Sequence, residues 1–114
     1  MEFRHQELDD GIRLVELDGS LDMSGAYAIQ VQFVRACEGN NVRVIVDLSS
    51  VSYISSVGIP MLVNTAKSVM EHGGKFVLLN PQKAVADVLE LTGISRVIRI
   101  YSNLETARAD LAIP

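Results

Sequence analysis

VRVIVDLSSVSYISSVGIPMLV, residues 42–63, contains a buried strand, a run of serines and the start of an amphipathic helix. The β-branched segment at 42–48 is typical of a parallel strand that is covered on both faces. After the serines, apolar residues recur at helical spacing. The core face predicted for this helix consists of Ile59, Leu62, Val63, Ala66, Val69 and Met70. The serines at 52–56 therefore join the carboxyl end of a strand to the beginning of a helix.

Strands and helices alternate on both sides of this stretch. Residues 3–8 have the polar character of an exposed edge strand, and a turn signal at 9–11 leads to a second strand at 12–17. Further strands are expected at 75–80 and 96–101. A helix follows the second strand, and its predicted core face consists of Ala26, Ile29, Phe33 and Cys37.

Cap signals mark two later helices. Asn80 and Pro81 have the pattern of a cap followed by proline at the first helical position. Ser102 and Glu105 have the spacing of a capping box before the last helix. The alternation predicts an α/β fold with one domain spanning residues 1–114. Its sheet is expected to have five mostly parallel strands with an antiparallel edge strand, and about four helices to pack on it.

The composition limits the classes of function. The formal net charge is −4 and no basic patch is present, so we expect no nucleic-acid partner. The single Cys37, the polar start of the chain and the lack of a long apolar run predict a cytoplasmic protein without direct membrane insertion. His5 and His72 are isolated, so neither a metal site nor a cofactor is expected. The serines lack the glycines of a nucleophile elbow and a nearby histidine, so the chain is not expected to be an enzyme.

Two strand-to-helix junctions carry the polar residues of a candidate site. One contains Asp22 and Ser24, and the other contains the serines at 52–56. The carboxyl ends of parallel strands meet at one edge of a sheet, so the two junctions are expected to lie side by side. Pro60 cannot lie inside a regular helix, which places the helix start at about Val57 or Gly58.

This helix start leaves two interpretations of Ser56. Its hydroxyl lies at the cap or just outside it, near solvent, where it can cap a free amide. Alternatively, it accepts a phosphate, because a helix N-terminus favours an added anion. Residues 48–66 carry no charge, so a phosphate would dominate this surface.

The face opposite the predicted core face is uncharged. It consists of Val57, Met61, Asn64, Thr65 and Ser68. An ordinary solvent-exposed face carries lysine and glutamate. Three explanations are open: another element of the same domain covers this stripe, the stripe is an uncharged surface without a role, or a partner protein binds to it. The third is based on the composition of interface cores, which are depleted in charge and enriched in methionine.

Three segments resemble the STAS domain family, and within it the anti-sigma factor antagonists. GSLDMSGAYAI at 19–29 resembles the Gly-x-Leu-Asp segment before the family's first helix. VIVDLSSVSYISSVGIPML at 44–62 resembles the family's strand, phosphorylation loop and helix. HGGKFVLLNPQKAVADVLELTGISRVIRIY at 72–101 resembles its Gly-Gly turn, later strands and Thr-Gly helix end. The similarity covers almost the whole chain.

The resemblance assigns roles to individual residues. Ser56 matches the family's phosphoacceptor, Gly58 the loop glycine, and Asp22 an acidic residue whose loop lies beside the acceptor. The chain departs from the family pattern at three positions. Ser55 replaces the usual aspartate and is an alternative acceptor. Val57 stands where the family often has serine or threonine, and Pro60 stands where it has glycine.

The role implied by the resemblance is a binding switch. The unphosphorylated domain would bind an anti-sigma factor that is also a serine kinase of the GHKL-type ATPase class, and so free a sigma factor. Phosphorylation of the loop serine with ATP would release the complex, and a serine phosphatase would reset it. The alternative is a STAS docking subunit of a transporter or another signalling assembly that is no longer phosphorylated.

Overall fold

The computed structural model describes residues 1–112 and has one five-stranded sheet in the order β1-β2-β3-β4-β5. The strands are β1 (Glu2–Glu7), β2 (Arg13–Leu21), β3 (Arg43–Ile54), β4 (Lys75–Leu79) and β5 (Ile100–Tyr101). β1 is antiparallel to β2, and the other neighbours are parallel. The predicted α/β fold, with its opening hairpin and antiparallel edge strand, is confirmed.

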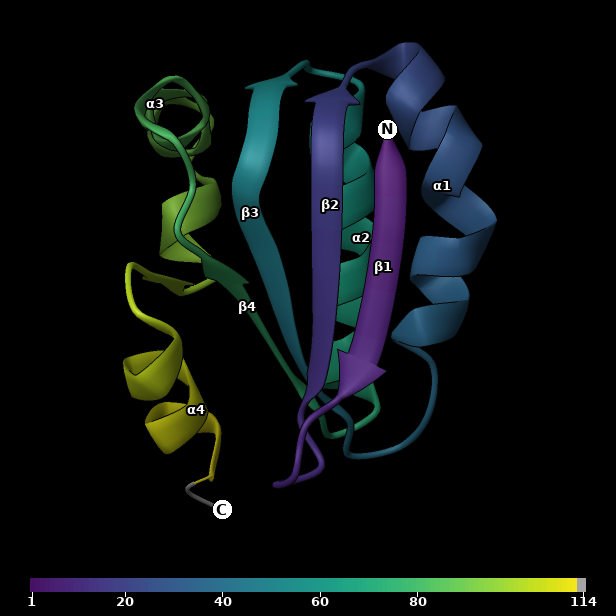
Figure 1. Ribbon diagram of the computed structural model, residues 1–114, viewed down its shortest axis with the longest axis vertical. Helices are drawn as coiled ribbons and strands as arrows, with labels where there is room; N and C mark the ends of the chain where they lie inside the picture. Colours follow the sequence, from purple (N-terminus) through teal and green to yellow (C-terminus); the bar gives the residue numbers. More distant parts are fainter. Residues whose placement is uncertain (113–114) are drawn as a thin grey trace.

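Helices cover both faces of the sheet, as Figure 1 shows. They are α1 (Met23–Ala36), α2 (Gly58–Glu71), α3 (Lys83–Leu91), the 3-10 helix η1 (Ile94–Arg96) and α4 (Leu104–Ala112). Successive strand residues point to opposite faces. Val44 and Val46 of β3 therefore join the larger core cluster with α1, α2 and α3, whereas Ile45 faces the smaller cluster under α4.

The first helix packs as its sequence pattern predicts. Ala26, Ile29 and Phe33 of α1 are buried, and Cys37 at its C-terminal end is only 4% exposed. Burial raises the pKa of the Cys37 thiol to about 12, and the nearby Arg13 charge acts in the opposite direction. Cys37 is therefore a core residue with a protonated thiol.

β3 is longer than its sequence pattern predicts. It continues through the serines to Ile54, so Ser52 lies in a strand and not in a loop. Two register shifts in the pairing of β2 with β3 each place an extra residue in β3. The shifts disrupt the alternation of buried and exposed residues, which is why residues 49–54 do not have the pattern of a strand.

β5 is shorter than predicted. Only Ile100 and Tyr101 of the segment 96–101 form a strand, because the preceding chain turns inward and buries Ile94 and Ile98.

The cap predictions are also wrong in detail. Asn80 adopts a left-handed conformation with φ of 51° before α3, which begins at Lys83. Asn103, and not Ser102, caps α4 by accepting the Thr106 N–H at 3.1 Å.

Candidate functional site

The two polar junctions lie side by side, as predicted. β2 and β3 run parallel and end together, with Leu21 paired to Ile54. The Ser55 N–H donates to the Leu21 carbonyl oxygen at 3.0 Å. α1 and α2 begin directly after these two strands, so their N-terminal turns start at the same edge of the sheet (Figure 1).

Ser55 and Ser56 have different environments. The Ser55 hydroxyl donates to the Leu21 carbonyl oxygen at 3.4 Å and accepts the Val57 N–H at 3.2 Å. Ser56 is exposed, and its hydroxyl has no hydrogen-bond partner within residues 1–112. Helix α2 begins at Gly58, as the position of Pro60 predicts, and places Ser56 just outside it. Ser55 therefore holds the turn, while Ser56 is available to another molecule.

Gly58 allows α2 to start against the end of β2. A Cβ atom at this position would lie 2.6 Å from the Leu21 carbonyl oxygen and 2.8 Å from Leu21 Cγ. Real Cβ atoms essentially never make contacts this short. The loop glycine is therefore required by close packing, and it fixes the position of Ser56 relative to β2.

The remaining predicted loop residues have structural contacts. Asp22 is the N-cap of α1, where its Oδ1 accepts the Gly25 N–H at 2.8 Å. Ser24 in the first turn is exposed. Ser52 is exposed on β3, with its hydroxyl 3.5 Å from the Gly19 carbonyl oxygen. Asp22 therefore orders the neighbouring junction without a hydrogen bond to Ser56.

The predicted faces of α2 are partly wrong. Met61 and Thr65 are buried, at 8% and 7% exposure, although both were expected on the outer stripe. Met70, expected in the core, is 43% exposed. Because α2 packs against both the sheet and α1, its buried face is displaced toward α1. For Met61 and Thr65, the interpretation that the domain itself covers the stripe is correct.

Three members of the stripe remain at the surface, namely Val57, Asn64 and Ser68. The structure adds exposed apolar residues that the sequence interpretation did not include. Met23 and Tyr27 of α1 are 61% and 80% exposed, and Tyr53 of β3 is 54% exposed. No residue from 23 to 34 is charged. The uncharged segment on this surface helix was the signal that could have identified the two residues of α1.

The site can accept a covalent modification or a partner. Apart from the Asp22 carboxylate, its side chains are hydroxyl, amide and apolar groups, and residues 48–66 contain no Asp, Glu, His, Lys, Arg or Cys side chain that could activate a serine. Within residues 1–112, no group of three His, Cys, Asp or Glu residues could hold a metal ion. In the same part of the chain, no helix combines the length and hydrophobicity needed to cross a membrane.

Several known proteins of similar sequence carry the name anti-sigma factor antagonist. A "Putative anti-sigma factor antagonist" of Thermotoga maritima is 33% identical over 69 residues, which are 60% of this chain and 61% of that protein. The "Putative anti-sigma factor antagonist BtrV" of Bordetella bronchiseptica is 26% identical over 100 residues, 88% of this chain and 86% of the relative.

Solved structures extend the similarity to the fold. The crystal structure of an anti-sigma factor antagonist from Mycobacterium paratuberculosis superposes with a TM-score of 0.84 at 25% identity, over 96% of this chain and 92% of that one. The murine anion transporter Slc26a9 contains the same fold, with a TM-score of 0.78 at 15% identity over 91% of this chain and 18% of the transporter. The family model described as "STAS domain" matches residues 6–107. The chain belongs to the STAS domain family.

Proposed function

We propose that the protein is a phosphorylation-controlled binding switch in which Ser56 is the phosphoacceptor. The unphosphorylated form binds an anti-sigma factor that is also a GHKL-type serine kinase, and this frees a sigma factor. The kinase phosphorylates Ser56 with ATP and dissociates, and a serine phosphatase restores the free hydroxyl. The observation that carries the proposal is the exposed Ser56 hydroxyl, which has no partner within residues 1–112 and lies directly before α2.

A phosphate on Ser56 would remain at the surface. It adds about −1.5 to −2 charges at neutral pH. The N-terminus of α2 favours an anion by only about 0.3–1 kcal/mol. Pro60 has no N–H, so the first turn of α2 also offers one donor fewer than most helices. The domain therefore does not sequester the phosphate, and its charge acts on the partner.

The partner surface combines residues from α1 and α2 and from the turn before α2. Val57 before α2, together with Asn64 and Ser68 of α2, is exposed and uncharged, and α1, which carries the exposed Met23 and Tyr27, begins at the same edge of the sheet. Such a surface suits a dry contact, into which a phosphate would bring a strongly hydrated anion. Repulsion from an acidic group of the partner would add roughly 1–4 kcal/mol per charge pair at about 4 Å. A contribution of about 1.4 kcal/mol or more weakens binding at least tenfold.

The test is phosphorylation by the cognate kinase with ATP, followed by mapping of the modified residue. We expect Ser56 to be modified in preference to Ser55 and Ser52. Ser56→Ala should bind the kinase and resist release, whereas Ser56→Asp should bind more weakly. Modification confined to Ser55, or undiminished binding by Ser56→Asp, would contradict the switch.

A docking subunit of a transporter or another signalling assembly is the second candidate function. It is favoured by Ser55, which stands where the family usually has aspartate beside the acceptor. Purification of the protein with its bound partner and mass spectrometry of the complex separates the two functions. A GHKL-type kinase supports the switch, and a transport permease with Ser56 unmodified supports the docking subunit.

A further inference from the structure

The sheet has an incomplete edge beside β4. β5 pairs only with Leu78 and Leu79, whereas β4 begins three residues earlier, at Lys75. The chain before β5 does not continue along β4, because η1 and the turn after it direct Ile94 and Ile98 into the core. Within residues 1–112, the first part of β4 therefore pairs with β3 alone.

Phe76 directs its backbone groups to the open side of this edge. The Lys75 N–H donates to the Val42 carbonyl oxygen next to β3, at 2.8 Å, and the Leu78 N–H donates to the Arg99 carbonyl oxygen on the β5 side, at 2.9 Å. Successive residues of a strand direct their backbone groups to opposite sides. The N–H and C=O of Phe76 therefore point away from β3, and neither has a backbone partner within residues 1–112.

These two groups belong to a residue that exposes little surface to solvent. Phe76 is only 4% exposed. Backbone groups that are hidden from water without a partner cost about as much free energy as a lost hydrogen bond. A segment that pairs with Phe76 would remove this cost with two hydrogen bonds, whichever direction it runs.

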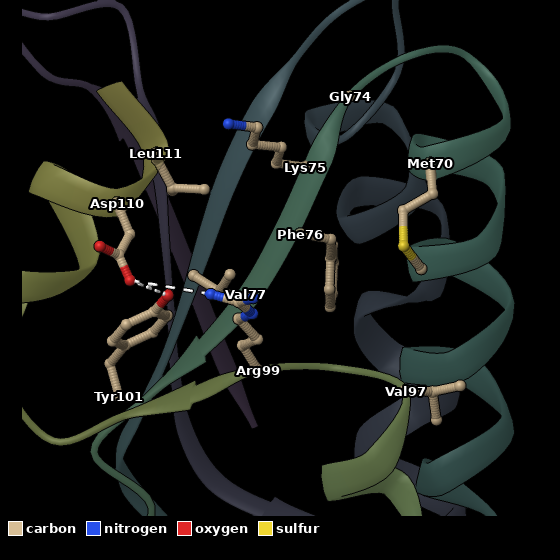
Figure 2. Close-up of a pocket in the computed structure, with 10 residues that line it drawn as sticks. All are labelled: Met70, Gly74, Lys75, Phe76, Val77, Val97, Arg99, Tyr101, Asp110 and Leu111. Carbon is tan, nitrogen blue, oxygen red and sulfur yellow. Dashed lines mark hydrogen bonds and ion pairs between the residues drawn. The ribbon is translucent and has the colours of Figure 1, made fainter. Parts of the chain in front are cut away.

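A pocket of about 340 Å³ lies along the same edge, between α2 and α4. Figure 2 shows Met70, Phe76 and Val97 on the side of α2, and Asp110 and Leu111 on the side of α4. Met70 is 43% and Val97 is 64% exposed, so the α2 side offers apolar surface that the domain leaves uncovered. The pocket is within the size range of ligand sites in proteins.

The α4 side of the pocket is polar and carries a cation that is mostly exposed to solvent. The Tyr101 hydroxyl donates to Asp110 Oδ2 at 2.5 Å, and Arg99 Nη1 lies 4.0 Å from the same oxygen. The hydrogen bond to Asp110, followed by burial, raises the pKa of Tyr101, so its hydroxyl stays protonated as a donor. Asp110 is thus engaged, while the Arg99 side chain is 80% exposed and can bind a second carboxylate.

We propose that this pocket binds an extended segment of a partner protein, which adds to β4 as a short strand. Its backbone pairs with Phe76, an apolar side chain packs on Met70 and Val97, and an acidic side chain on the opposite face meets Arg99. Such strand addition takes its affinity from main-chain hydrogen bonds and its specificity from alternate side chains. The site is separate from Ser56 and does not depend on the proposed switch.

A peptide display selection on the purified full chain tests the proposal. The probe is a library of random heptapeptides on phage. We expect enrichment of sequences that alternate apolar and acidic residues. A synthetic copy of an enriched peptide should shift the backbone amide NMR signals of Gly74, Phe76 and Arg99, and should slow hydrogen exchange of the Phe76 amide.

Two variants and a matched control locate the peptide. Val97→Asp should weaken binding of the synthetic peptide about tenfold, because it puts a hydrated carboxylate on the surface where the apolar side chain of the peptide packs. Arg99→Glu should weaken binding of the synthetic peptide by a similar factor. This variant should instead prefer an analogue of the peptide that has lysine in place of the acidic residue. Leu91→Asp is the control, since Leu91 is 87% exposed at the end of α3 and does not line the pocket. It should leave the affinity unchanged.

Several results would overturn the inference. A selection without enrichment on the folded chain would do so, as would a peptide whose NMR shifts fall at the α1 and α2 N-termini. A dimer in analytical ultracentrifugation that is abolished by Val97→Asp would assign the edge to a second copy instead. Equal loss of affinity in Val97→Asp and Leu91→Asp would show that charge alone, and not this pocket, determines binding.

Discussion

Replacement of Gly58 by alanine tests the close contact that positions the serine site. The added Cβ would lie 2.6 Å from the Leu21 carbonyl oxygen. Ordinary van der Waals contact requires a displacement of about 0.8 Å, and the acceptor is backbone that Ser55 also bonds. The start of α2 must therefore move away from the end of β2.

The expected cost follows from two opposing contributions. Overpacking of this size typically costs about 1–3 kcal/mol. Alanine is a better helix former than glycine by up to about 1 kcal/mol in a helix interior, and by less at the first position. We expect Gly58→Ala to lower the free energy of unfolding by about 1–2 kcal/mol, as the difference between these two contributions.

Urea denaturation of three matched variants measures the effect. Gly25→Ala should be the most destabilised, because its Cβ would lie 2.1 Å from the Ser20 carbonyl oxygen. Gly58→Ala should be intermediate, and Ser68→Ala, at an exposed position of α2, should stay within about 0.5 kcal/mol of the parent. A Gly58→Ala variant as stable as the parent, with an unshifted Ser55 amide NMR signal, would refute the reasoning.

Further predictions concern the faces of α2, the core cysteine and the serine turn. Met61→Glu should destabilise the fold by at least about 3 kcal/mol in urea denaturation, because it buries a carboxyl group and loses apolar packing. Asn64→Glu, at an exposed position of the same helix, should fold normally and weaken binding of the proposed kinase partner, and unchanged affinity would place the partner elsewhere. The pKa of the Cys37 thiol is 9.0, the ordinary value, in the unfolded chain and about 12 in the folded chain. The contribution of the buried thiol to the free energy of unfolding should therefore be fully present below pH 9 and be lost as the pH rises from 9 to 12. Cys37→Ala should flatten this decline, and an identical decline in both proteins would exclude the thiol as its cause. Ser55→Ala should lower stability by about 0.5–1.5 kcal/mol through loss of the Val57 and Leu21 hydrogen bonds, whereas Ser56→Ala should change it by less than about 0.5 kcal/mol.

The sequence predicts the fold because local patterns and packing agree along most of the chain. Helical spacing identified the buried face of α1, and the β-branched run identified β3. The errors occur where tertiary contacts alter the local pattern. Met61 and Thr65 have the spacing of an outer face, but α1 packs beside α2 and covers them.

The errors in the strands have the same origin. The segment 96–101 has a strand pattern, yet burial of Ile94 and Ile98 takes most of it out of the sheet. The register shifts in β3 result from pairing with β2 and leave no mark in the composition of 49–54. The sequence could place Ser56 at a helix start, but the different environments of Ser55 and Ser56 depend on the position of the Leu21 carbonyl, which is set by the neighbouring strand.

The division of roles between these two serines is what makes a switch compatible with a stable fold. Ser55 meets the hydrogen-bonding needs of the turn, through its N–H and hydroxyl to Leu21 and through the Val57 N–H. Ser56 makes no hydrogen bond within residues 1–112, so its chemical state can change without breaking a contact that holds α2 to β2. An aspartate at position 55 would turn a carboxylate toward the Leu21 carbonyl oxygen, whereas serine can donate to it. In the proposed switch, the neutral Ser55 would keep residues 48–66 uncharged until Ser56 is phosphorylated, and the electrostatic change would then act on the partner.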